Sequence, residues 1–253
     1  MLVNGVRVEL TGLMAAAVAT DELERTVLLG VQTKPPHDEA RLIELLGEEF
    51  ARDVLAVGPM MDALATRPGP DESDAMALAS DLLAFFHDRL KVFLKDQGIR
   101  HDVIDACLAM PGNDDLTLLV KRAQALQAFL SSDDGTNLLQ GFKRANNILF
   151  QAEAKDGVEY SFGADPKFAE TDAERALFNA LDVAEQAIGP AMKAEDFAAA
   201  MGGMAQLRAP IDAFFDAVQI NAENEILRRN RLNLLHRIRA ICSGVADLTK
   251  VDG

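Results

Sequence analysis

The sequence predicts an all-α protein made of one or more helical bundles. Alanine and leucine dominate, runs of β-branched residues are rare, and helix start and stop signals recur along the chain. Hydrophobic residues make up 49% of the 253 residues and charged residues 26%, which is enough apolar material for a core. No repeat of fixed period is present, so we do not expect a solenoid.

The N-terminal part is expected to contain two helical segments joined by a linker. Apolar residues recur at helical spacing over residues 38–66. The following segment 67–73, RPGPDES, holds two prolines and a glycine, a composition typical of a linker. A long helix is then predicted over 74–97, ending at Gly98.

The middle of the chain is expected to contain three helices. A short helix over 101–109 is followed by the helix-breaking pair Pro–Gly. Asp114 or Asp115 can cap the next helix, 116–130, because a carboxylate accepts from the free amides of a first turn. A third helix begins after Gly135 and includes the segment FKRANNILFQAE.

An irregular segment and a capped helix follow. The segment 156–166, DGVEYSFGADP, is predicted as a loop and holds the only tyrosine. Thr171 and Glu174 have the spacing of a capping box, which predicts a helix over 172–188. The pair Gly–Pro at 189–190 is expected to end this helix.

The C-terminal part is expected to contain three further helices. Two of them, 194–208 and 210–219, are separated at Pro210, and the last helix spans about 226–247. At 100° per residue, the last helix has one apolar face, formed by Leu227, Leu234, Ile238 and Ile241.

One arginine of the last helix lies close to this apolar face. Arg231 needs a partner there, because an isolated buried charge is too costly. Asp212 and Asp216 are four residues apart and share a helix face, so we predict a structural ion pair between Arg231 and one of them. The alternative is that Arg231 lies near a groove and contacts phosphate.

The two cysteines and the lack of known catalytic motifs argue against a catalytic or metal-binding site in this chain. Cys107 and Cys242 are predicted to be buried, reduced thiols, which suits the cytoplasm, and neither has a CxxC partner that would indicate zinc. The nucleotide-binding patterns GxGxxG and GxxxxGK[ST] are missing, as is the hydrolase pattern GxSxG. No run of about 18 apolar residues is present either, so a transmembrane helix is not expected. We therefore predict no catalytic residue, no metal site and no membrane partner.

The charge restricts any nucleic-acid function. The formal net charge is −15, whereas a phosphate-binding surface should be basic. Residues 221–241 differ from the rest of the chain, because they contain five arginines and two glutamates. An acidic protein with one basic face can bind RNA specifically, but it will not bind nucleic acid indiscriminately.

Several segments together resemble a known family. They include PIDAFFDAV, LRRNRLNLL and VADLTKV near the C-terminus, and FFHDRLKVFLKDQGIRHDVIDACLA, ALQAF and FKRANNIL before them. The chain resembles the C-terminal region of the bacterial β subunit of glycyl-tRNA synthetases of the α2β2 type. The opening VNGVRVEL resembles the family segment that follows its central HD-type domain, so the resemblance covers nearly the whole chain in family order.

The resemblance implies a fold and a function. Residues 101–253 would form a helical domain like the anticodon-binding domain of arginyl-tRNA synthetases, and residues 1–100 a helical connecting region. In this family of glycine-tRNA ligases the α subunit carries the aminoacylation site, which uses ATP and Mg²⁺, and the β subunit recognises tRNA. The implied partners are tRNA-Gly, the α subunit and the remainder of the β subunit, in the cytoplasm. The alternative is a helical protein–protein module that docks the α subunit or the rest of β without touching RNA.

Two segments carry the candidate RNA contacts. On the last helix, Arg228, Arg229, Arg237 and Arg239 point to the sides of the apolar face or away from it. In FKRANNIL, Lys143, Asn146 and Asn147 flank the apolar face and Arg144 lies nearly opposite it. The cations would contact phosphates, and the asparagines would bond base edges or 2′-hydroxyls. The alternative for Asn146 or Asn147 is a hydrogen bond to a neighbouring loop.

Overall fold

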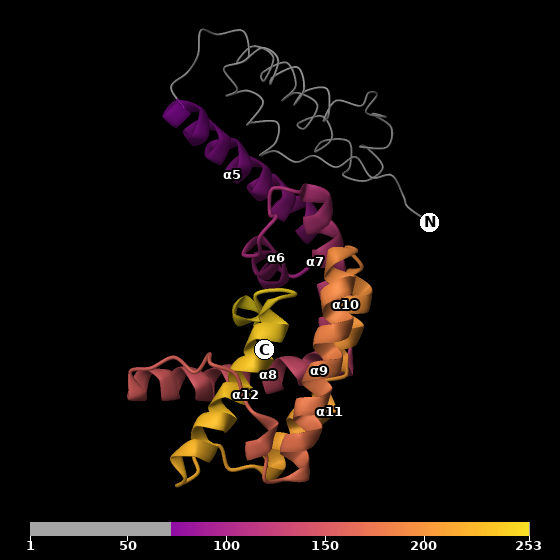
Figure 1. Ribbon diagram of the computed structural model, residues 1–253. Helices are drawn as coiled ribbons and strands as arrows, with labels where there is room; N and C mark the ends of the chain where they lie inside the picture. Colours follow the sequence, from indigo (N-terminus) through magenta and orange to yellow (C-terminus); the bar gives the residue numbers. More distant parts are fainter. Residues whose placement is uncertain (1–71, 253) are drawn as a thin grey trace. The chain divides into compact units, whose positions relative to one another are not determined.

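The computed structural model describes residues 72–252, and every regular element within them is a helix, as predicted (Figure 1). The predicted helix over 38–66 and most of the linker 67–73 lie outside the described residues. Glu72 and Ser73 of that predicted linker already belong to the first described helix. The elements are α5 (Glu72–Asp96), α6 (His101–Leu108), α7 (Leu116–Leu130), α8 (Asp133–Asp156), η1 (Pro166–Phe168), α9 (Asp172–Lys193), α10 (Phe197–Ala205), α11 (Arg208–Ala217), α12 (Glu225–Ser243) and η2 (Leu248–Lys250).

The chain divides into two compact units. The described part of the first unit comprises residues 72–104 and 111–120, and the second comprises 105–110 and 121–252. Helices α6 and α7 contribute residues to both units. The division at residue 100 that the sequence suggested stays a prediction.

Helix α5 ends with a Schellman motif. The N–H of Gly98 donates to the Lys95 carbonyl at 2.9 Å, and the N–H of Ile99 donates to the Leu94 carbonyl at 3.0 Å. Gly98 has a φ of +82°, the left-handed conformation that this motif requires. The predicted end of this helix at Gly98 is confirmed.

Side-chain caps set the starts of α7 and α8. Of the two candidate caps for α7, Asp115 accepts from the N–H of Leu118 at 2.9 Å. Helix α8 begins two residues before the predicted Gly135, because Ser132 caps it by accepting from the N–H of Gly135 at 3.1 Å. A Cβ at Gly135 would lie 2.0 Å from the Phe129 carbonyl oxygen, so only glycine fits there.

Helix α9 begins as predicted and ends later. The capping box is present: the Thr171 hydroxyl accepts from the N–H of Glu174, and the Glu174 carboxylate accepts from the N–H of Thr171. The predicted end at residue 188 is wrong, because the helix continues through Pro190 to Lys193. Proline removes one helical donor, whose acceptor would be the carbonyl of Gln186, an exposed residue that water can reach.

Two of the last three helices, α10 and α12, are shorter than predicted. Helix α10 starts at Phe197 because Asp196 caps it through the N–H of Ala199. Helix α11 begins and ends two residues earlier than predicted. Pro210 lies in its first turn, as predicted, where its missing N–H costs little. Helix α12 starts after its cap Asn224 and ends at Ser243, four residues before the predicted end.

The core of the second unit lies between α8, α9, α11 and α12 (Figure 1). Helices α10 and α11 pack on α9, and α12 packs across α8. Of the apolar face predicted for α12, Leu234, Ile238 and Ile241 are buried and Leu227 is half-buried. Within residues 72–252 no helix is long and apolar enough to cross a bilayer.

Both cysteines are free and buried, as predicted. Burial raises the pKa of Cys107 and of Cys242 to about 12. Both thiols therefore stay protonated at neutral pH.

Candidate functional site

The structure places Arg231 in a buried ion pair, but with different partners from those predicted. Arg231 Nε donates to Glu174 Oε1 at 2.8 Å, and Arg231 Nη2 donates to Glu170 Oε2 at 3.1 Å. The side chains of Arg231 and Glu174 are 7% and 1% exposed. The predicted pair with Asp212 or Asp216 is wrong: Asp212 lies 3.8 Å from Arg208, one turn earlier in α11, and both aspartates are exposed.

Glu174 joins this pair to the start of α9. Its carboxylate accepts from the backbone amides of Thr171 and Glu170 as well as from Arg231. Burial acts to raise the pKa of Glu174, but the hydrogen bonds from Arg231 and from the two amides outweigh it. The net pKa therefore lies below the ordinary value, and the carboxylate stays charged at neutral pH.

Arg228 holds the loop that follows α8. It donates to Asp156 Oδ2 at 2.6 Å and to the Tyr160 hydroxyl at 3.1 Å, and the Tyr160 hydroxyl donates to the same Asp156 oxygen. The hydrogen bonds from Tyr160 and Arg228 hold the pKa of Asp156 below its ordinary value. Arg228 is therefore half-buried in a polar cluster rather than free to meet a ligand.

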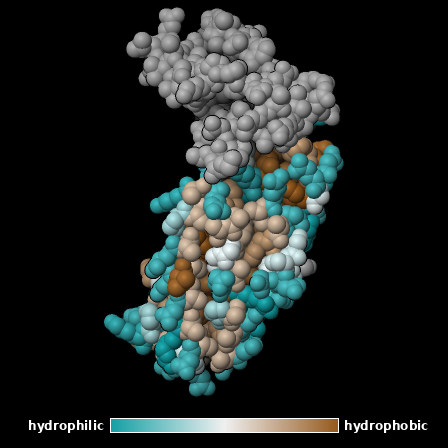
Figure 2. All heavy atoms as spheres, turned by 90° about the vertical axis from the view of Figure 1, so that its right-hand side faces the viewer, coloured by the Kyte–Doolittle hydropathy of each residue, from teal (hydrophilic) through white to brown (hydrophobic). Residues whose placement is uncertain are grey.

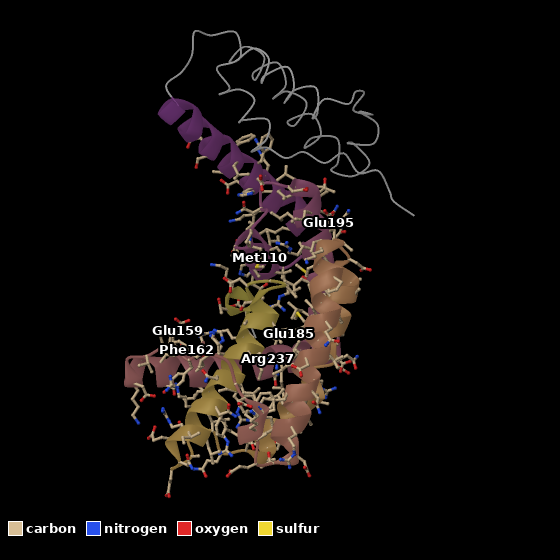
Figure 3. The ribbon with its side chains drawn as sticks, in the orientation of Figure 1. Met110, Glu159, Phe162, Glu185, Glu195 and Arg237 are labelled. Atoms are coloured by element: carbon tan, nitrogen blue, oxygen red, sulfur yellow. The ribbon has the colours of Figure 1, made fainter. Side chains whose placement is uncertain are left out.

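Arg237 and Arg239 also meet carboxylates. Arg237 donates to both oxygens of Glu185 on α9, at 2.9 and 2.8 Å, and to Asp182 one turn earlier (Figure 3). Hydrogen bonding to Glu185 raises the pKa of Arg237. Arg239 donates to the two oxygens of Glu153 on α8, at 3.1 and 3.2 Å. These two arginines link α12 to the helices on either side of it.

Three predicted cations have no carboxylate partner among the described residues. The guanidinium of Arg144 lies 4.4 Å from the centroid of the Phe215 ring, and that of Arg229 lies 5.9 Å from the Phe162 ring. Both arginines are exposed, and Lys143 is half-buried. These three side chains keep the charge that a phosphate needs.

The amide side chains predicted to contact RNA lie on the solvent side of α8. Asn147 is exposed and Asn146 half-buried, and one turn after them Phe150 is 67% exposed. Lys143, Asn146, Asn147 and Phe150 fall within a narrow arc of the helix, since residues three and four apart are neighbours. Sequence reasoning missed Phe150, although its spacing from Asn146 and Asn147 was visible.

Sequence reasoning also missed Phe162, which lies in the loop between α8 and η1. It is 81% exposed, the highest value among the large hydrophobic side chains described (Figure 3). An aromatic residue placed next to a glycine in a polar loop was the available signal, because folding alone does not require it there.

Comparison with known proteins identifies the region that holds these residues. Residues 138–252 match the family described as DALR anticodon binding domain. The match runs from Leu138 in α8 to Asp252. All eight residues predicted to bind tRNA lie within it, from Lys143 on α8 to Arg239 on α12. Their contact with RNA stays a prediction.

The matches to known relatives extend beyond residues 138–252. The chain is 75% identical over 198 residues to a glycine–tRNA ligase beta subunit of Cereibacter sphaeroides, which covers 78% of this chain and 28% of the relative. It is 66% identical over 208 residues to one of Dinoroseobacter shibae, covering 77% and 29%. With one from a Ruegeria species the identity is 73% over 174 residues, covering 69% and 25%. The chain thus spans little more than a quarter of the length of these relatives.

Proposed function

We propose that this chain is the tRNA-binding part of a glycine–tRNA ligase β subunit and holds the anticodon arm of tRNA-Gly. The observation that carries the proposal is the anticodon-binding domain at residues 138–252, in a chain so similar to glycine–tRNA ligase beta subunits. In this proposal the α subunit carries the aminoacylation site with ATP and Mg²⁺, in the cytoplasm. The segment itself does no chemistry and positions the tRNA.

The charges of the domain favour selective over general RNA binding. Lys143, Arg144 and Arg229 are available to phosphates, whereas Arg228, Arg237 and Arg239 already meet carboxylates. If a phosphate displaced one of these carboxylates from its arginine, the unpaired carboxylate would remain as a negative charge next to the phosphate. The electrostatic part of the affinity should therefore come from about three cations.

A salt series tests both the function and this count. The affinity of the chain for tRNA-Gly and for a non-cognate tRNA is measured at several salt concentrations. We expect preference for tRNA-Gly and a slope of log K against log salt of about −2, which is roughly −0.7 for each of three phosphates. A slope near −4 would mean that the three paired arginines also exchange their carboxylates for phosphates.

The alternative, a protein–protein module, has one observation in its favour. On the face shown in Figure 2, weakly hydrophobic residues form a band bordered by hydrophilic ones, and Ala198 and Ala199 of α10 are exposed. The small residues of α10 have a simpler explanation in part, because Gly203 packs against Ile188 of α9. Equal and negligible binding to both tRNAs, together with binding to the purified α subunit, would favour this alternative.

A further inference from the structure

Phe162 is an exposed aromatic ring whose backbone is held on both sides. Two residues before it, Tyr160 is buried, and its hydroxyl bonds Asp156 and Arg228. Three residues after it, the N–H of Asp165 donates to the Asn230 side chain at 2.8 Å, and the Asn230 amide donates back to the Asp165 carbonyl at 3.1 Å. The backbone on both sides of Phe162 is therefore anchored to α8 and α12.

The residue after Phe162 is suited to presenting the ring. Gly163 has a φ of +87°, a backbone conformation that residues other than glycine rarely adopt. Gly157, with a φ of +66°, starts the same loop at the end of α8. Gly157 thus lies before the anchored Tyr160, whereas Gly163 lies between Tyr160 and Asp165, directly after Phe162.

Three consecutive residues of α12 serve this loop. Arg228 binds Tyr160, Asn230 binds Asp165, and Arg229 between them lies over the ring of Phe162 at 5.9 Å. The contacts of Arg228 and Asn230 fix the loop. The contact of Arg229 places an exposed guanidinium beside the exposed ring of Phe162. This guanidinium has no carboxylate partner among the described residues.

Building on the proposed function, we propose that Phe162 and Arg229 form a stacking platform for an unpaired base of the anticodon loop. Unpaired bases bind proteins by stacking on aromatic rings and on guanidinium planes. The platform offers both surfaces on a preformed support, so little entropy is lost when a base stacks. The Arg229 charge also lies where it can meet the phosphate next to that base.

The test is a cycle of protein and RNA changes with an RNA hairpin that carries the anticodon stem and loop of tRNA-Gly. The dissociation constant is measured by fluorescence anisotropy for the chain and for Phe162→Ala, Phe162→Tyr and Val183→Ala. Each loop nucleotide of the hairpin is also replaced in turn by an abasic residue. Val183 is the matched control, because it is an exposed apolar side chain on α9, outside the loop.

We expect Phe162→Ala to weaken binding about 5- to 150-fold, the range for losing one stacked base, with no change in the salt slope. Phe162→Tyr and Val183→Ala should bind like the unchanged chain. One abasic position should weaken binding to the unchanged chain but have no further effect in Phe162→Ala. Arg229→Gln should flatten the salt slope by about 0.7.

Two results would overturn the platform, and they differ in what they imply for the function. If Phe162→Ala binds the hairpin as tightly as the unchanged chain, while the chain still prefers tRNA-Gly to a non-cognate tRNA, the platform is wrong and the proposed function stands. If the unchanged chain binds neither the hairpin nor tRNA-Gly, both proposals fail.

Discussion

Glu174→Gln should strongly destabilise the second unit, because it leaves Arg231 buried beside a neutral side chain. Breaking a buried ion pair typically costs about 3–5 kcal/mol. We expect the lower end, about 3 kcal/mol, since Glu170 and the Gln219 carbonyl still accept from Arg231. The substitution is close to isosteric, so the loss reports on charge rather than on packing.

The matched control is an exposed ion pair of similar length. Arg175 Nη2 lies 2.7 Å from Asp172 at the exposed start of the same helix, against 2.8 Å for Arg231 and Glu174. Breaking the exposed pair by Arg175→Gln should cost no more than about 1 kcal/mol, because water already solvates both charges. The difference between the two variants reports the burial of the Arg231–Glu174 pair together with the bonds that Glu174 accepts at the start of α9.

Urea unfolding followed by tyrosine fluorescence suits this measurement. The chain has one tyrosine and no tryptophan, and Tyr160 belongs to the second unit. With an m-value of about 3 kcal/mol/M, Glu174→Gln should lower the urea midpoint by about 1 M. A midpoint shift no larger than that of Arg175→Gln would refute the assignment of Arg231 and Glu174 as a stabilising buried pair.

The same pair has a predictable pH dependence. The pKa of Glu174 is lower in the folded state than its ordinary value, so its contribution to stability is complete above the unfolded pKa. That contribution is lost as the pH falls through the folded pKa. The difference in unfolding free energy between the unchanged chain and Glu174→Gln should therefore shrink below about pH 4.5.

Three further predictions concern packing, thiols and the loop cluster. Gly141→Ala should destabilise by about 1–3 kcal/mol, because its Cβ would lie 2.9 Å from an isoleucine methyl of α11, whereas Gly202→Ala meets open space and should stabilise slightly in the same urea experiment. Cys242, with a pKa raised to about 12, should react with a thiol reagent only after unfolding; rapid reaction of the native chain would contradict its burial. Arg228→Ala should raise the pKa of Asp156 toward its ordinary value in an NMR titration, and an unchanged pKa would show that the two side chains do not pair.

Sequence reasoning worked best where the determinants are local. The capping box of Thr171 and Glu174 and the end of α5 at Gly98 depend on bonds between residues three to five apart, which a sequence shows directly. The end of α9 was missed because a glycine and a proline weaken a helix without always ending it. There the surrounding packing decides, and the sequence does not show it.

The partners of the arginines could not be found in the same way. A helical wheel gives the direction of Arg231 but not what it meets, and its partner Glu174 is 57 residues away. Arg237 and Arg239 meet carboxylates 52 and 86 residues away. The sequence therefore did not show that three of the five arginines of α12 link it to neighbouring helices and that a fourth holds a loop. Their contact with RNA stays a prediction.

This pairing changes how an acidic domain can select one RNA. In the proposed function Lys143, Arg144 and Arg229 meet phosphates, which are common to all tRNAs, so their contribution to affinity should be nearly equal for cognate and non-cognate tRNA. With a slope of about −2, that shared contribution falls about 16-fold when salt rises fourfold. On this proposal, discrimination comes from contacts to bases, and the proposed ones are stacking on Phe162 and hydrogen bonds from Asn146 or Asn147. The ratio of the two affinities should accordingly stay constant across the salt series while both affinities fall, and a ratio that collapsed with salt would place the discrimination in the charges instead.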